Sequence, residues 1–292
     1  MTTFRIGDIE ATRVEDFVDP GVPIKFLLPE LPDDAIARNA DWLAPLFLNV
    51  ADATVDIHIQ SWLLRTKHHT ILVDACVGNL KTRHFPPFNM RNSPYLANLA
   101  AAGARPADVD FVFCTHLHSD HVGWNTRLDN GRWVPTFPNA RYLFSRADYE
   151  GLDPRGKAPN PEDSANEAFL DSVLPVVEAG QADIVEGGHV VADGLTIDAA
   201  PGHSPGHSML RVESAGDSGL FIGDAMHHPM QIAEPQVNSF ACVDPAAARD
   251  TRRRILEECC DCNRLLVPGH FAAPHMGRVS RAAAGFLFKP GL

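Results

Sequence analysis

Apolar and polar residues recur along the chain with two periods, which predict strands near the N-terminus and alternating strands and helices afterwards. Two-residue alternation over 4–14 and 55–66 and an apolar run at 70–74 predict strands, the last two joined as a hairpin. Further strands are predicted at 110–115, 139–145, 183–186, 189–191, 195–199, 208–213, 219–223 and 264–268, and helices at 93–103, 165–174 and 245–260. This order of elements predicts two packed sheets with helices outside them.

Two segments fit neither period. Residues 19–50 are rich in proline and large apolar side chains, and we interpret them as an N-terminal excursion that packs near the functional site. Residues 151–166 are polar and rich in proline and glycine, which predicts a loop. Because no linker and no internal repeat divides the chain, we expect a single domain over 1–292.

Composition and charge exclude some partners. A hydrophobic content of 45% is sufficient for a packed core, and a formal net charge of −12 without a basic stripe argues against nucleic acid. No stretch reaches the roughly 18 apolar residues that span a bilayer, and the N-terminus lacks a signal-peptide pattern, so we expect no membrane partner. The six cysteines follow no disulfide spacing, which favours a cytoplasmic location.

The strongest chemical signal is a set of seven potential metal ligands on predicted strand-end loops. Four follow the apolar strand at 110–115, and three more stand beside glycine or proline near the ends of later apolar runs. These seven are His116, His118, Asp120, His121, His203, Asp224 and His270. Three imidazoles and a carboxylate on one loop gain nothing from burial without a metal, and seven ligands suit two ions better than one.

This pattern resembles the metallo-β-lactamase-fold superfamily over roughly residues 50–275. The resemblance implies an α/β (α+β) fold, an αββα four-layer sandwich, with a dinuclear site at the open edge of the two sheets. It implies two Zn²⁺ per chain, although iron, manganese or cobalt remain alternatives.

The resemblance also implies a division of the ligands. His116, His118 and His203 would bind one ion, Asp120, His121 and His270 the other, and Asp224 would bridge them. Asp74, at the end of the run 71–74, matches a family carboxylate that orders the ligand loop, and His207 is expected to donate a hydrogen bond behind the ligands.

Within the superfamily, Asp224, the excursion and the run 223–231 look most like the lactonase and methyl-parathion-hydrolase branch. The implied activity is that of a hydrolase whose metal-bridging hydroxide attacks a lactone or ester carbonyl. Asp120 and His227 are the candidate catalytic residues. His227 stands where characterised acyl-homoserine lactonases carry a substrate-assisting tyrosine, and an imidazole can donate the same hydrogen bond. The alternative is that His227 packs against the ligands or supports one of them by a hydrogen bond.

Other activities remain open alternatives: a phosphotriester or aryl-ester hydrolase, a glyoxalase II-like thioester hydrolase, and, more remotely, a non-catalytic metal-binding protein. We expect a small, apolar lactone or ester as substrate. Six apolar residues are candidates for a substrate-binding wall, with the hydrophobic core or a homodimer contact as the alternative: Phe26, Leu28, Trp42, Phe47, Phe85 and Phe88.

Overall fold

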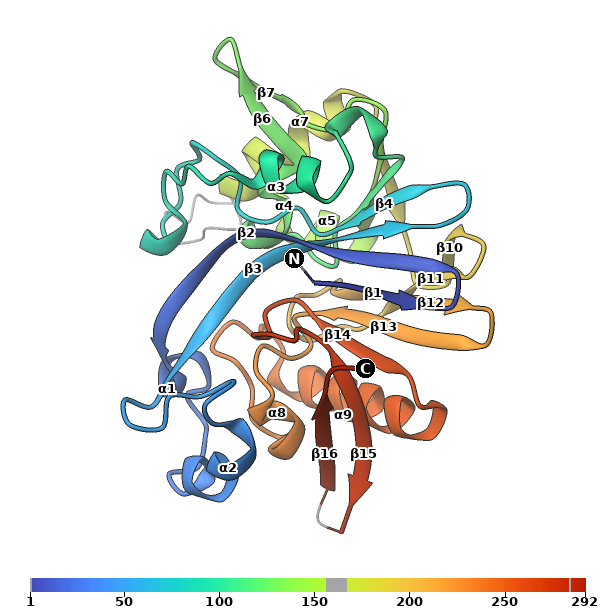
Figure 1. Ribbon diagram of the computed structural model, residues 1–292. Helices are drawn as coiled ribbons and strands as arrows, with labels where there is room; N and C mark the ends of the chain where they lie inside the picture. The colour runs from blue at the N-terminus through green and yellow to red at the C-terminus, as the bar shows by residue number, and fades with distance from the viewer. Residues whose placement is uncertain (1, 156–166, 284) are drawn as a thin grey trace.

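The computed structural model describes residues 2–155, 167–283 and 285–292. Over these residues the main strands form two sheets of seven, which pack face to face (Figure 1). Helices cover the outer faces, which confirms the predicted four-layer sandwich. The expectation of a single domain over the whole chain stays a prediction.

The first sheet has the strand order β1-β2-β3-β4-β5-β8-β9. Its strands are β1 (Thr3–Ile6), β2 (Ile9–Pro23), β3 (Thr54–Arg65), β4 (Thr70–Val73), β5 (Phe111–Phe113), β8 (Arg141–Ser145) and β9 (Ala182–Val185). The predicted hairpin is β3–β4. Strands β4, β5, β8 and β9 run parallel to one another, so their carboxyl ends lie at the same edge of the sheet.

The second sheet has the order β10-β11-β12-β13-β14-β15-β16. Its strands are β10 (His189–Ala192), β11 (Leu195–Ala199), β12 (Ser208–Ser214), β13 (Asp217–Gly223), β14 (Leu265–Pro268), β15 (Gly277–Ala282) and β16 (Gly285–Pro290). Strands β13 and β14 are parallel neighbours, so the residues that follow them lie side by side.

The sequence patterns did not predict two hairpins. One is β15–β16, and the other is the separate pair β6 (Thr126–Asp129) and β7 (Arg132–Pro135). In β16 the side chains alternate between exposed and half-buried, without a fully buried position, so the apolar alternation that marks a strand is weak there.

The helical elements are short, apart from one. They are α1 (Ile24–Leu27), α2 (Ala35–Leu43), η1 (Pro86–Phe88), α3 (Tyr95–Ala101), η2 (Pro106–Asp108), α4 (Ser119–Val122), η3 (Gly123–Asn125), α5 (Arg146–Leu152), the π-helical η4 (Phe169–Val173), α7 (Leu174–Glu178), α8 (Met230–Ala233) and α9 (Pro245–Cys262). Figure 1 places α3 and α7 outside the first sheet and α9 outside the second. In the described parts of the chain, none of these helices combines the length and apolarity that crossing a membrane requires.

The longest helix, α9, matches the one predicted at 245–260. The Asp244 side chain accepts hydrogen bonds from the backbone N–H groups of Ala246 and Ala247, and Pro245 occupies the first helical position. The helix predicted at 165–174 appears as η4 and α7, from Phe169 onwards. Most of the predicted loop 151–166 lies outside the described residues, and its first two residues end α5.

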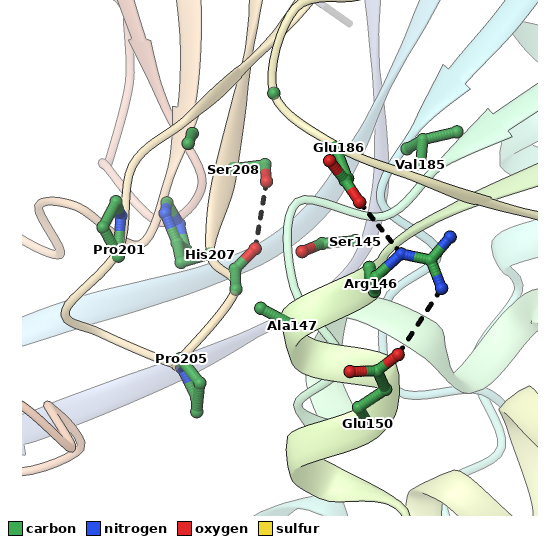
Figure 2. A pocket seen from close by; sticks show the side chains of 13 residues that line it. Ser145, Arg146, Ala147, Glu150, Val185, Glu186, Pro201, Pro205, His207 and Ser208 are labelled. Carbon is green, nitrogen blue, oxygen red and sulfur yellow. Dashed lines mark hydrogen bonds and ion pairs between the residues drawn. The ribbon is translucent and has the colours of Figure 1, made fainter.

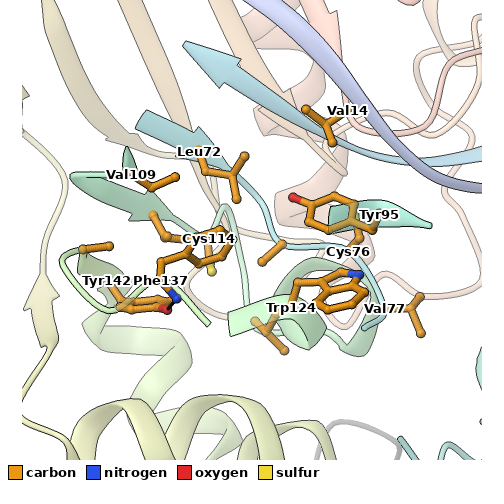
Figure 3. Packing of buried hydrophobic residues seen from close by; sticks show 14 of the residues in the cluster. Val14, Leu72, Cys76, Val77, Tyr95, Val109, Cys114, Trp124, Phe137 and Tyr142 are labelled. Carbon is orange, nitrogen blue, oxygen red and sulfur yellow. Dashed lines mark hydrogen bonds between the residues drawn. The ribbon is translucent and has the colours of Figure 1, made fainter. Parts of the chain in front are cut away.

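The core between the sheets takes aromatic side chains from both of them. The Phe4 ring lies 5.2 Å from that of Trp62 and 6.4 Å from that of Phe221, measured between centroids. A second cluster, on the helix side of the first sheet, stacks Tyr95 on Trp124 at 5.2 Å (Figure 3). Because Trp124 stands three residues after the predicted ligand loop, this cluster packs next to the loop.

The N-terminal excursion packs against the segment that follows Asp224. Its first residues, 19–23, extend β2, and α1 and α2 follow them. The Phe47 carbonyl lies 2.8 Å from the His228 ring, and the Phe240 N–H donates to the Leu27 carbonyl. The excursion therefore lies beside the region where the candidate ligands meet.

Candidate metal centre

The predicted ligands follow the ends of neighbouring strands, so the fold brings them to one edge. The segment 116–121 follows β5, Asp224 follows β13 directly, His270 follows β14, and His203 lies in the loop before β12. All seven side chains meet there. The structure sorts them into groups whose ligand atoms lie within 4.8 Å of one another.

The first group, which we call the imidazole triad, consists of His116, His118 and His203. His116 Nε2 lies 3.0 Å from His118 Nδ1 and 3.1 Å from His203 Nε2, and the last two atoms are 3.0 Å apart. Burial lowers the pKa of each of the three rings, so the neutral form is favoured. Three ring nitrogens therefore converge on one point.

The second group, which we call the acidic group, consists of Asp120, His121, Asp224 and His270. His270 Nε2 lies 3.0 Å from Asp224 Oδ1, and His121 Nε2 lies 3.3 Å from the same oxygen. Asp120 Oδ2 lies 3.5 Å from His270 Nε2. Burial lowers the pKa of His121, but the carboxylates of Asp224, Asp74 and Asp120 outweigh burial and hold it well above its usual range.

Asp224 stands between the two groups. Its Oδ1 faces the acidic group. Its Oδ2 lies 3.2 Å from His270 Nε2 in that group, and 3.4 Å from His203 Nε2 and 3.9 Å from His116 Nε2 in the triad. Burial raises the pKa of Asp224, yet the rings of His270, His121 and His227 together hold it well below its usual range. This placement is the one that a bridging carboxylate needs.

The donor set fits metal cations. His270 Nδ1 lies 2.9 Å from the His58 carbonyl, which can only accept, so Nδ1 carries a proton and Nε2 faces Asp224. Burial lowers the pKa of His270, but the carboxylates of Asp224 and Asp120 outweigh burial and raise it. Both ring nitrogens of His121, and Asp224 Oδ1, are buried without a well-aligned hydrogen bond from the described residues, although acidic or imidazole atoms lie within 3.3 Å. A metal cation would replace the proton that His121 Nε2 carries toward Asp224 and would be bound by both side chains.

Asp74 supports the ligand loop as expected from its position after β4. Its Oδ1 accepts a hydrogen bond from the Thr115 N–H at 2.7 Å, and the Thr115 hydroxyl lies 3.0 Å from both carboxylate oxygens. Its Oδ2 lies 3.0 Å from His121 Nδ1. Asp74 therefore fixes both the start of the ligand loop and the orientation of the His121 ring.

His207 lies behind Asp224, but its contact differs from the expected one. The backbone N–H of Asp224 donates to His207 Nε2 at 3.0 Å, and His207 Nδ1 donates to the Ala200 carbonyl at 3.0 Å. His207 thus accepts, rather than donates, on the side of the ligands. The Asp224 N–H requires a lone pair at Nε2 and so determines the tautomer.

His227 joins the centre from the loop after β13. Its Nε2 lies 3.1 Å from Asp224 Oδ2, its ring centroid is 4.9 Å from that of His203, and its side chain is buried. Together with His203 and Asp224, it forms a third group of potential ligand atoms.

Two residues that sequence reasoning missed hold the loop that carries His227. Gln231 Oε1 accepts from the His227 N–H at 2.7 Å. The buried Arg252 of α9 donates to the carbonyls of Ala225 and Pro235 at 3.1 and 2.6 Å. A buried guanidinium that binds backbone oxygens leaves no local sequence pattern, because its partners are not side chains.

The predicted apolar wall divides in two. Leu28 and Phe47 are buried in the cluster that joins the excursion to the loop after Asp224, so they serve the core, which was the alternative interpretation. Phe26 is 48% exposed, and its ring lies 4.9 Å from that of Phe240, from the loop after α8. A wall role stays a prediction for Phe26 and for the half-buried residues Trp42, Phe85 and Phe88.

A cavity of about 340 Å³ lies beside the centre, between α5 and the loop 201–208 (Figure 2). Arg146 and Glu150 line it, and Arg146 forms ion pairs with Glu150 at 3.4 Å and with Glu186 at 3.0 Å. Among the predicted site residues within the described ranges, only His207 lines this cavity. The cavity therefore lies behind the ligand loop.

Comparisons with known proteins agree with this architecture. The model of the metallo-beta-lactamase superfamily matches residues 55–270. The N-acyl homoserine lactonase AiiA of Bacillus thuringiensis subsp. kurstaki is 25% identical over 215 residues, which cover 70% of this chain and 77% of that protein. The N-acyl homoserine lactonase AttM of Azorhizobium caulinodans is 32% identical over 137 residues, which cover 44% of this chain and 46% of that protein.

Two solved structures share the fold over nearly all of both chains. AidC, a dizinc quorum-quenching lactonase solved in complex with a product, superimposes with a TM-score of 0.82 at 20% identity, covering 99% of this chain and 97% of AidC. The hydrolase AbOPH of the beta lactamase superfamily gives a TM-score of 0.82 at 23% identity, covering 100% and 97%.

Proposed function

This chain belongs to the metallo-beta-lactamase superfamily, and from that premise we propose that it is a dinuclear zinc hydrolase that opens lactones or cleaves related esters. The predicted family and fold are confirmed, and the predicted enzyme class, a metal-dependent hydrolase of ester bonds, agrees with curated relatives that are N-acyl homoserine lactonases. The observation that carries the proposal is the position of Asp224, whose carboxylate lies within 3.4 Å of ring nitrogens from both groups of ligands.

The imidazole triad would hold one zinc ion, the acidic group the other, and Asp224 would contact both. Bound there, two zinc ions lower the pKa of a water molecule and polarise a carbonyl oxygen. The protein holds its ligands rigidly, because Asp74 orients His121, the His58 carbonyl orients His270 and His207 holds the backbone of Asp224. Asp120 is the most accessible of the carboxylates at the centre, with 15% of its side chain exposed, and we assign it the transfer of the proton of the attacking hydroxide to the leaving alkoxide.

We further propose that His227 assists the substrate. Its Nε2 lies 3.1 Å from Asp224 Oδ2, at the boundary of the two groups, and this position supports a role for the ring as a hydrogen-bond donor to the carbonyl oxygen of a lactone or ester. His227→Phe should lower kcat about 10- to 100-fold, with little change in KM and with two metals retained. His227→Tyr restores a donor and should recover part of the loss. An unchanged kcat in His227→Phe would assign the ring to packing.

The decisive experiment measures metal content and hydrolysis on the same sample. Protein purified without added metal is analysed for zinc, iron, manganese and cobalt, and is assayed with γ- and δ-lactones, p-nitrophenyl esters, a thioester and paraoxon. We expect about two zinc ions per chain, and lactone or ester hydrolysis that is lost on chelation and in His118→Ala. The matched control is His68→Ala, because His68 is an exposed turn residue.

The outcomes separate the candidate functions. Preference for paraoxon or the thioester would replace the lactone assignment and keep the metal centre. Fewer than two metals, with no hydrolysis after zinc is restored, would reject the dinuclear hydrolase and favour a metal-binding protein.

A further inference from the structure

Helix α5 presents one buried carboxylate to two ligand loops. The helix follows β8 and faces the loop 201–208 in Figure 2. Asp148, in its first turn, is fully buried. Neither the proposed ligand set nor the proposed chemistry uses this side chain, so the reason for burying its charge lies in what it contacts.

Three donors from two loops converge on Asp148. The backbone N–H of Leu117 donates to Oδ2 at 3.0 Å, and the Ser204 hydroxyl donates to the same oxygen at 2.9 Å. The backbone N–H of Gly206 donates to Oδ1 at 2.5 Å. Leu117 stands between the ligands His116 and His118, and Ser204 follows His203, so two of the three hydrogen bonds are made beside a member of the imidazole triad.

We infer that Asp148 is a positioning residue for the imidazole triad, because its carboxylate locks the His116–His118 loop to the His203 loop and thereby sets the affinity of the triad for its metal ion. This inference rests on the proposed function, since it requires a metal bound by the triad.

The contacts require a carboxylate rather than any polar side chain. Both oxygens of Asp148 accept, one toward Leu117 and Ser204 and the other toward Gly206. An asparagine offers one accepting oxygen, so its amide N–H₂ would face a donor on one of the two loops. Gly206 also lets the loop approach α5, because a Cβ at this residue would lie 2.3 Å from the Asp148 nitrogen.

Other groups support the remaining ligands. Asp74 orients His121, and the His58 carbonyl orients His270. Loss of the Asp148 contacts should therefore weaken one of the two metal sites and spare the other.

The test locates the weakened site by pairing Asp148→Asn with two ligand variants. His121→Ala leaves the triad to bind a single zinc ion, and His118→Ala leaves the acidic group to do so. The zinc dissociation constant of each is measured by chelator competition, with and without Asp148→Asn. In the His121→Ala background we expect zinc affinity to fall about 10- to 100-fold. In the His118→Ala background the zinc affinity should change by less than about twofold, which is the deviation expected when two sites act independently.

A control and a milder variant keep the test decisive. Glu150→Gln changes an exposed carboxylate on the same helix and should leave both affinities unchanged. If Asp148→Asn does not fold, Ser204→Ala removes one of the three hydrogen bonds, and a loss of zinc affinity of about fivefold, in the triad alone, is expected.

Equal losses in both backgrounds, or no loss in either, would overturn the inference. Unfolding of the metal-free proteins is followed in parallel, because a purely structural role lowers their stability without this selectivity. If the unmodified protein binds fewer than two zinc ions, the proposed function fails. If it binds two and Asp148→Asn binds both as tightly, only the role of Asp148 fails.

Discussion

The imidazole triad and the acidic group are supported in different ways. The loops of the triad are joined by one side chain, Asp148. The loop that carries His121 is joined to the segment after β4 by main-chain hydrogen bonds: Ala75 N–H to the His121 carbonyl, Gly123 N–H to the Cys76 carbonyl, and Trp124 N–H to the Ala75 carbonyl, at 2.8, 2.7 and 2.6 Å. The first support depends on a charge alone, whereas the second combines the close approach of two backbones with the Asp74 carboxylate that orients His121.

This difference indicates which kind of substitution should disturb the imidazole triad and which should disturb the acidic group. A main-chain contact tolerates changes of side-chain chemistry but not of volume, so substitutions there should affect folding. A side-chain contact tolerates little chemical change, so substitutions there should affect the position of the ligands. Four experiments test this division.

The largest effect is expected from Gly123→Ala, in the main-chain contact of the acidic group. A Cβ at this residue would lie 1.7 Å from the Val77 carbonyl oxygen, and a backbone atom cannot move aside cheaply. We expect the free energy of unfolding to fall by more than about 4 kcal/mol, measured by urea denaturation. The control is Gly151→Ala in α5, whose Cβ would meet Pro205 at an ordinary 3.4 Å. Similar losses in the two variants would refute the close-approach explanation.

Asp224→Asn should have the next largest effect, because Asp224 faces both groups. An amide cannot supply two anionic oxygens, so the variant should bind both zinc ions more weakly and lose about 10³-fold in kcat/KM for its best ester substrate. Zinc content by elemental analysis and steady-state kinetics measure these effects. Loss of one ion alone would place Asp224 in a single group and contradict its position between them.

Removal of metal should lower the stability of the protein less than Gly123→Ala does, because the main-chain contacts form without metal. A ligand present at 1,000 times its dissociation constant stabilises a protein by about 4 kcal/mol, and chelation removes that contribution. We expect the melting temperature to fall while the far-ultraviolet circular dichroism spectrum of the folded state is retained. A chelated protein without secondary structure would show that metal, not the backbone, holds the ligand loops.

The smallest effect is expected from His207→Gln. Glutamine can accept from the Asp224 N–H, but it cannot also reach the Ala200 carbonyl as the imidazole does. We expect a loss of about 1 kcal/mol in stability and a modest loss of zinc affinity in both groups. His207→Leu leaves both backbone partners unpaired and should lower stability more than His207→Gln does. Equal losses of stability in the two variants would show that neither hydrogen bond matters.

The sequence predicted those features that local patterns encode. Apolar runs marked β5, β13 and β14, the last two of which end in glycine or proline, and the structure brings together all seven residues that stand at these and neighbouring ends. The sandwich followed from the order of strands and helices. The residues that family resemblance assigns to each ion lie close together in space, and their division between two ions stays a prediction.

Features that depend on packing were not predictable. Asp148, Gln231 and Arg252 act through backbone partners far away in the sequence, and no local pattern marks them. Leu28 and Phe47 lie in an irregular segment, where the sequence does not distinguish an apolar residue that joins the core from one that lines a site. The orientation of the His207 ring followed from an N–H group that only the fold places beside it.

The edge where the ligands meet also determines when in folding the site appears. His203 and His116 are 87 residues apart in the sequence, His270 and Asp224 are 46 apart, and the His58 carbonyl that orients His270 is 212 residues from it. Contacts of such long range close late, after the entropy of the intervening loops has been lost. An ion that meets the nascent chain finds at most the short segment 116–121. The seven candidate ligands come together only after the two sheets have docked, so uptake of the proposed zinc ions would be the last step of assembly rather than the first.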